Sequence, residues 1–383
     1  MHFWVEMISI DLAAPTIPSS VRAWRMFPGR GYKFVASFLE QQVCFLDLPG
    51  LDLPTGRIGA LDDLVARISR SDALQDYFTE YGPEFSPNLP LSDFISSRKT
   101  QHRTLVKNAL VNLFDEAKVG DYITIPSPIS YGRIYVGRFG SNRKVSGYYR
   151  ERYGENIIIA RRVHWLGEYA ENTISSELSS SLRHEHPFSL LARGLIEEIL
   201  SLAHGAFVFG ERCAATIFND ENDFLDSDAA LLGVISRFSS SACKAIDENI
   251  EGLASLDILE ILLQSPSYEY TCSQISDIHS PGFIRYIGGA ATALVISAVV
   301  ASLIALGENG NKETLKQDIE SIQYVNSSTQ ADPLCTAKVS DASRRILLTL
   351  DIDKTWSLCQ AAVQAKKRAG LRSSANHSSD EAH

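Results

Sequence analysis

Cationic and aromatic side chains alternate along one stretch of this chain, between residues 139 and 156. Lysine and arginine side chains neutralise phosphate, and tyrosine rings can stack on unpaired nucleobases. The stretch therefore predicts a nucleic-acid-binding surface, although a solvated loop without a ligand would have the same composition. The cations are Arg143, Lys144, Arg150 and Arg152, and the interleaved aromatic residues are Tyr148, Tyr149 and Tyr153.

The charge of the chain is unevenly distributed. The 383 residues have a formal net charge of −10. The segment from 98 to 165 instead has an excess of positive charge, with 13 Lys and Arg against 5 Asp and Glu. A basic module inside an acidic protein is the pattern expected where one domain meets phosphate. We therefore expect DNA or RNA as a partner of this segment.

Four further arginines and two tryptophans complete the predicted site, namely Arg133, Arg138, Arg161, Arg162, Trp24 and Trp165. Arg161 and Arg162 are neighbours in an expected strand, so their side chains point to opposite faces and only one can reach a shared groove. The two tryptophans would form a wall beside an unstacked base. Core positions are the alternative for both, because large aromatic side chains are mostly buried.

The motifs of common catalytic and metal sites are missing from the sequence. There is no phosphate loop, no dinucleotide loop and no nucleophile elbow. The six cysteines include no CxxC pair and no close Cys/His pairing, so neither a zinc site nor a disulfide framework is predicted. We expect no catalytic residue, no metal and no cofactor. A nuclease that uses Asp351 and Asp353 is the enzymatic alternative, and the segment His184 to His186 is a weaker metal candidate.

The elements that must position these side chains are strands and helices in alternation. Apolar spacing predicts a strand-rich segment over 24–48, helices over 61–77 and 96–114, and strands over 122–125, 133–139 and 157–163. The expected fold class is α+β, with a mixed α/β domain that contains a small β-barrel followed by a mainly helical domain.

The order of these signals resembles a known module. A Trp-x-x-x-Pro-Gly opening at Trp24 precedes VGDYITIP (119–126), GRIYVG (132–137) and RRVHWL (161–166). This order is similar to that of the PUA-like and EVE-like barrels found at the front of Mcr- and Mrr-type restriction and phage-defence proteins. The resemblance covers about 140 residues of the sequence. It implies a module that senses nucleic acid, including modified bases, and partner defence proteins.

One uncharged block, Tyr286 to Leu306, stands out in the second half of the chain. A helix of this length rises about 30 Å, which matches the hydrocarbon core of a bilayer. Small side chains recur every fourth residue and would form a stripe for helix association. The alternative is a buried central helix of a soluble domain. The members of the stripe are Gly289, Ala293, Ser297, Ala301 and Ala305.

These observations predict four segments. They are a lead segment (1–20), the PUA/EVE-like domain (21–170), a helical domain (171–370) with a candidate transmembrane helix at 286–306, and a disordered tail (371–383). We expect an anti-phage defence protein, whose cytoplasmic nucleic-acid-sensing module is coupled to an oligomerising half anchored in the inner membrane. The alternative function is a soluble, non-catalytic DNA-binding subunit of a restriction or defence complex.

Overall fold

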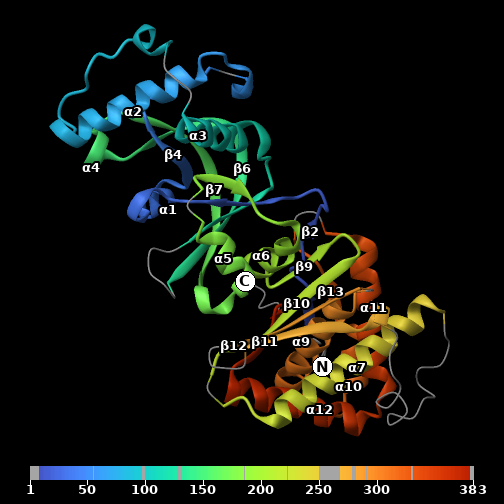
Figure 1. Cartoon of the computed structure of the whole chain (residues 1–383). Coiled ribbons are helices and arrows are strands. Elements are labelled where there is room, and N and C mark those ends of the chain that lie inside the picture. Colours follow the sequence, from blue (N-terminus) through green and yellow to red (C-terminus); the bar gives the residue numbers. More distant parts are fainter. Residues whose placement is uncertain are drawn as a thin grey trace, which may run out of the picture. The chain divides into compact units, whose positions relative to one another are not determined.

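The computed structural model describes residues 8–54, 56–96, 100–126, 132–184, 186–221, 223–249, 268–277, 282–289, 291–328 and 331–379. The described chain is a mixed α+β protein with three sheets, which agrees with the expected fold class. It forms two compact units (Figure 1). Unit 2 is Ser20–Ala203, and unit 1 joins Met1–Ser19 to His204–His383.

Unit 2 is built on one six-stranded sheet with the order β4-β7-β6-β5-β3-β8. Within the described residues its terminal strands, β4 and β8, do not pair with each other, so the sheet is open and not the closed barrel expected. Its strands are β3 (Ala23–Met26), β4 (Val43–Pro49), β5 (Tyr122–Ile125), β6 (Arg133–Tyr148), β7 (Ile157–Ala170) and β8 (Phe188–Leu190). Its helices are α1 (Val35–Gln41), α2 (Leu64–Tyr81), α3 (Gln101–Val111), α4 (Arg150–Tyr153), α5 (Ser176–Leu182) and α6 (Ile196–Ala203), with a π-helical turn at Asn112–Glu116.

The long hairpin β6–β7 is the main difference from the expected strands of this unit. Both strands extend well beyond 133–139 and 157–163, and two register shifts bend the hairpin. The basic and aromatic stretch is therefore mostly strand rather than loop. Aromatic rings pack around Phe34, the residue before α1. Its ring lies 5.0 Å from that of Phe45 on β4 and 5.1 Å from that of Tyr149, which follows β6.

Unit 1 contains two sheets, with the orders β13-β1-β15 and β11-β12-β10-β9-β2, and β14 also pairs with β10. The expectation of a mainly helical domain missed these sheets. The strands are β1 (Ile8–Asp11), β2 (Thr16–Ile17), β9 (Ala206–Phe209), β10 (Arg212–Asn219), β11 (Cys272–Asp277), β12 (Gly282–Gly288), β13 (Gln323–Val325), β14 (Leu371–Ser373) and β15 (Asn376–Ser379). The helices include α7 (Asp226–Asp247), α9 (Thr292–Asn309), α10 (Leu315–Ser321), α11 (Pro333–Thr349) and α12 (Ile352–Ala369).

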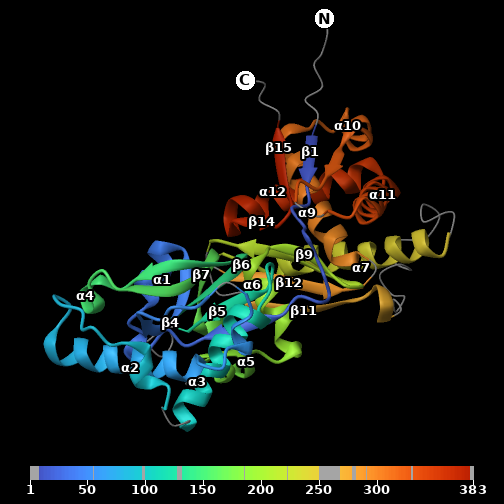
Figure 2. The same ribbon diagram turned by 90° about the horizontal axis from the view of Figure 1, so that it is seen from above.

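Two expected segments take a different form. The lead segment is part of unit 1, because β1 pairs with both β13 and β15, and Figure 2 shows β15 beside β1. The segment expected to be a disordered tail forms β14 and β15 over residues 371–379, and the later residues lie outside the described part. The domain change expected near 170 falls at Ala203 and His204. The strand pairs formed over long sequence separations account for all three differences.

The uncharged block does not form one helix. Its first residues, Tyr286 to Gly288, end strand β12, and α9 begins only at Thr292. Every residue of α9 up to Leu306 is buried, and the helix packs against α7, α11, α12 and β10. By length and composition α9 could cross a membrane, but 83% of its apolar window is buried inside the protein. These contacts are those of the alternative considered for this block, a buried central helix.

The polar side chains of α9 also bond within unit 1. The Ser297 hydroxyl lies 2.6 Å from the Ser373 hydroxyl and accepts a hydrogen bond from the Ala375 amide at 3.0 Å. The Ser302 hydroxyl lies 2.9 Å from that of Tyr324. Of the predicted stripe, Gly289 precedes α9, and Ala293, Ser297, Ala301 and Ala305 are all buried. The stripe packs inside this chain, so it offers no surface for a second copy.

Burial gives two thiols in this core an alkaline pKa. It raises the pKa of Cys213 and of Cys243 from 9.0 to about 11. Unit 1 is therefore expected to lose stability as the pH rises through this range. Below pH 9 both thiols keep their protons in the folded and unfolded chains, so their contribution is complete. Above it, the unfolded chain releases protons that the folded chain retains, which favours unfolding.

Urea unfolding at a series of pH values measures this loss. A double variant, Cys213→Ala with Cys243→Ala, removes both titrating groups and should show a shallower decline between pH 9 and pH 11. Equal declines in the double variant and the parent would contradict the assignment.

Candidate nucleic-acid interface

Trp24 is a core residue rather than part of a ligand wall. Its side chain is 2% exposed, and its ring stacks on Phe188 with centroids 5.1 Å apart. The indole Nε1 donates to Asp121 Oδ2 at 2.9 Å, which fixes β3 against the turn before β5. The core alternative is therefore the one that the structure adopts for Trp24.

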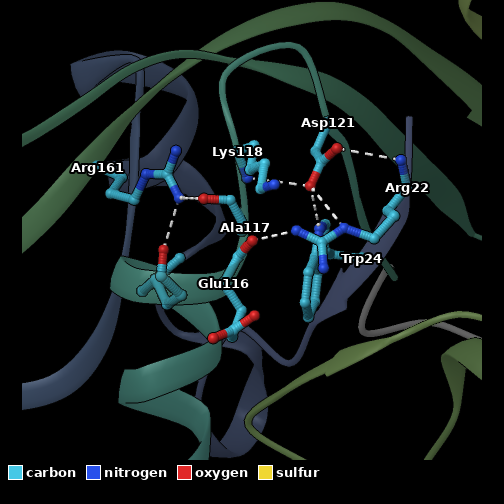
Figure 3. Close-up of polar contacts among 8 residues, drawn as sticks. Arg22, Trp24, Glu116, Ala117, Lys118, Asp121 and Arg161 are labelled. Carbon is cyan, nitrogen blue, oxygen red and sulfur yellow. Dashed lines mark hydrogen bonds and ion pairs between the residues drawn. The ribbon is translucent and has the colours of Figure 1, made fainter. Parts of the chain in front are cut away.

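The Asp121 carboxylate accepts several hydrogen bonds at this turn (Figure 3). Besides the Trp24 indole, its carboxylate accepts the backbone N–H groups of Arg22 and Lys118, each at 3.0 Å. The Arg22 guanidinium completes the set, with Nε 3.3 Å from Oδ2. Asp121 is only 3% exposed, so this network satisfies a buried charge and is structural.

Arg161 is also structural, whereas Arg162 is exposed. The Arg161 guanidinium donates to the carbonyl oxygens of Leu113 at 2.6 Å and Ala117 at 2.8 Å (Figure 3). The Leu113 carbonyl lies within the π-helical turn and the Ala117 carbonyl directly follows it, and Arg161 itself is 0% exposed. The expectation that only one of the two adjacent arginines can reach a ligand is met, and that residue is Arg162.

Several of the predicted cations are engaged inside unit 2. Arg133 pairs with Glu168, and Arg152 donates to the Thr79 hydroxyl at 2.8 Å. The Lys144 ammonium donates to the Pro54 carbonyl at 2.5 Å. Glu168 neutralises the charge of Arg133, whereas the contacts of Arg152 and Lys144 occupy their donor groups and leave their charge. The side chain of Arg143 lies outside the described residues. Trp165 is half-buried, and its indole donates to the Phe38 carbonyl at 2.9 Å.

Tyr148, Tyr149 and Arg150 meet at one hollow of about 490 Å³ beside α1. Two hydrogen bonds between the Gln41 amide and the Tyr148 backbone, at 2.7 and 2.9 Å, fix the end of β6 there. Burial, helped by the charge of Glu151, raises the pKa of Tyr149. Two cations and two carboxylates share the walls, so the hollow has no charge preference. The remaining lining residues are Lys33, Ala36, Ser37, Glu40 and Glu151.

A second group of Lys, Arg and His side chains lies near Arg162, on the same side of the sheet. Arg138 on β6 is opposite His164 on β7, and Arg162 lies two residues before His164 on the same strand. The Arg138 guanidinium reaches over the turn before β5, where its Nη2 lies 3.4 Å from where a Cβ on Gly120 would be. Lys118 is exposed on the same turn. We call Lys118, Arg138, Arg162 and His164 the basic stripe.

The basic stripe differs from Arg133 and Arg150, which form ion pairs with Glu168 and Glu155. None of its four side chains forms an ion pair with a carboxylate in the part of the chain that the structure describes. Lys118, Arg162 and His164 are exposed, and Arg138 is half-buried. Unpaired and exposed cations keep their whole charge for an external anion. An extended row of this kind suits the backbone of a polyanion better than a single small anion.

Two members of the basic stripe, Lys118 and His164, were not among the predicted residues. The signal for His164 is its spacing of two from Arg162, which places both side chains on one face of a strand. The signal for Lys118 is weaker, because its place beside Arg138 depends on the register of β5 and β6. A one-residue error in that register would move Arg138 to the other face.

The described residues contain no group of three or more His, Cys, Asp or Glu side chains able to hold a metal ion. The two candidate nuclease carboxylates have structural partners. Asp351 caps α12 by accepting the Lys354 amide at 2.8 Å, and Asp353 pairs with Lys312 at 2.7 Å. The His184 carbonyl accepts a hydrogen bond from Arg25, and Glu185 lies outside the described residues.

No family model, no curated protein and no solved structure matches this chain. The resemblance to PUA-like and EVE-like modules therefore stays a prediction that rests on the sequence motifs alone.

Proposed function

We propose that unit 2 binds DNA or RNA through the basic stripe, and that the protein is a non-catalytic nucleic-acid-binding subunit of an anti-phage defence or restriction complex. The observation that carries the proposal is a row of three cations, Lys118, Arg138 and Arg162, beside His164, none of which has a carboxylate partner among the described residues, in a chain of net charge −10. The motif order from Trp24 to Leu166 supports the defence role by resemblance only. The buried position of α9 favours the soluble alternative over membrane anchoring.

The physical basis is the release of counterions. Each cation that neutralises a phosphate frees condensed counterions, so the logarithm of the binding constant falls with the logarithm of the salt concentration, by about 0.9 per phosphate on a duplex. The rest of the chain is acidic and repels the same backbone, which orients the nucleic acid toward the stripe. The three Lys and Arg contacts would therefore give a slope of about −2.7.

Fluorescence anisotropy of a labelled oligonucleotide across a salt series tests this. A variant with Arg138→Glu and Arg162→Glu should bind more weakly at every salt concentration, and its slope should be shallower by about 2. The reason is that two phosphate contacts are lost while the fold keeps its buried arginine, Arg161.

The matched control is Arg150→Glu, which reverses an exposed charge at the hollow, outside the stripe. It should leave the slope unchanged. If Arg150→Glu weakens binding and the stripe variant does not, the ligand occupies the hollow and the proposed interface is wrong.

The stripe variant also tests the biological role, because cells that express it should lose whatever protection the parent protein gives in a phage plating assay.

A further inference from the structure

The strand β11 is the end of a sheet in unit 1, and from Cys272 to Ser276 no strand among the described residues pairs with its outer edge. It ends the sheet β11-β12-β10-β9-β2 and pairs with β12 through six consecutive residue pairs without a register shift. The other terminal strands of the three sheets are β2, β8, β13 and β15, with two to four residues each, and β4, which contains a bulge and ends at Pro49. Short or interrupted edges resist pairing with another strand, whereas β11 has neither protection.

The side chains of β11 also leave the edge open. Its sequence is CSQISD, with no proline and no lysine, and the four central residues are exposed. Ile275 is 50% exposed, which is unusual for an isoleucine in a strand. The outer N–H and C=O groups of such a strand can bond to another extended backbone, which offers matching groups in a row.

We propose that β11 pairs antiparallel with β11 of a second copy of this chain, about a two-fold axis that passes beside Ile275. A two-fold contact uses the same surface on both copies, and an antiparallel strand pair is self-complementary in this way. In this register Ile275 lies opposite Ile275 of the second copy, so each shields the exposed apolar surface of the other. Gln274 then lies opposite Ser276, and Ser273 opposite Asp277.

The charges permit this pairing although the whole chain is acidic. Asp277 is the one charged residue of β11, and it lies two residues from the proposed axis. The two copies of Asp277 would therefore be about 14 Å apart along the paired strands. This separation exceeds the Debye length of about 8 Å at physiological salt, so their repulsion is screened. The assembly is independent of the nucleic-acid proposal, since β11 belongs to unit 1.

Cysteine cross-linking of the full chain tests the register. Facing residues of an antiparallel pair have Cα atoms about 4.5–5.5 Å apart, which is within reach of a disulfide. Ile275→Cys should therefore give a covalent dimer as the main product in oxidised glutathione. The matched control is Ser273→Cys, also exposed on β11, whose two copies would lie about 14 Å apart and should stay largely monomeric.

Light scattering during size exclusion supplies the second measurement. The parent chain of 42.3 kDa should elute with twice that mass, and Ile275→Lys should shift it to the monomer with an unchanged melting temperature, because it replaces an exposed side chain. A monomeric parent, a dimer that survives Ile275→Lys, or equal cross-linking of Ile275→Cys and Ser273→Cys would each overturn the proposal. The parent chain in oxidised glutathione controls for its six native cysteines.

Discussion

Replacing Asp121 by alanine is expected to lower the free energy of unfolding of unit 2 by about 3–5 kcal/mol, because each buried donor that loses its acceptor costs about 1–3 kcal/mol. The substitution leaves the Trp24 indole and the backbone amides of Arg22 and Lys118 without their acceptor. It also leaves the Arg22 guanidinium without its carboxylate partner. Chemical denaturation followed by tryptophan fluorescence measures the change, because Trp24 lies at the centre of the network.

The control for Asp121→Ala is Asp62→Ala in the same unit. Asp62 is an exposed carboxylate just before α2, and its removal should change the free energy of unfolding by less than about 0.5 kcal/mol. Asp121→Asn separates the two parts of the effect, since it keeps an acceptor oxygen but removes the charge. Similar denaturation midpoints for Asp121→Ala and Asp62→Ala would mean that the turn before β5 is not held by this carboxylate.

Ending the chain after Gly370 is expected to unfold unit 1 and leave unit 2 folded. The truncation removes β14 and β15, and with them the Ser373 and Ala375 hydrogen bonds to Ser297 on α9. Each hydrogen bond contributes about 1 kcal/mol, and losing the buried Leu371 side chain removes about 1.5–3 kcal/mol more of stabilisation. Together with the lost strand pairs, this approaches the whole stability of a domain, about 5–15 kcal/mol.

Limited proteolysis shows which unit is lost. A resistant fragment close to residues 20–203 should remain, because unit 2 has its own apolar core. Ending the chain after Ser379 keeps every described strand and should leave the digestion pattern unchanged. If the chain that ends after Gly370 melts like the parent, this segment does not hold α9, and the membrane alternative for that helix regains support.

The sequence predicted local features of the fold better than distant pairings. The helix near 61–77 and the opposite orientation of Arg161 and Arg162 follow from apolar spacing and strand geometry, and both agree with the structure. The secondary structure of the uncharged block was harder to predict. The end of β12 and the helix α9 are both apolar, so no change in hydropathy marks the boundary between them. Nothing local in the sequence at Ile8 or Ser379 indicates that these residues face each other in one sheet.

The candidate site was predicted in part for the same reason. Composition identified the basic segment, and strand alternation indicated that only one of Arg161 and Arg162 could face a ligand. Composition does not show which cations form hydrogen bonds or ion pairs inside the protein. Both Arg161 and Arg162 were therefore included in the predicted site. Arg161 is occupied by the carbonyls around a π-helical turn, and that turn has no simple sequence signature. The partners of Arg133, Lys144 and Arg152 likewise come from other elements.

The discontinuous order of unit 1 sets a sequence of events during synthesis. Strand β1 leaves the ribosome first, but its partners β13 and β15 emerge only after all of unit 2 and most of unit 1. Pairings so distant in the chain form slowly, whereas unit 2 is contiguous and can fold as soon as it emerges. Unit 1 cannot close until its last strand is made. A nascent or interrupted chain would therefore contain a folded unit 2 and an α9 whose apolar surface is exposed to solvent. Chaperones and proteases recognise exposed apolar segments of this kind.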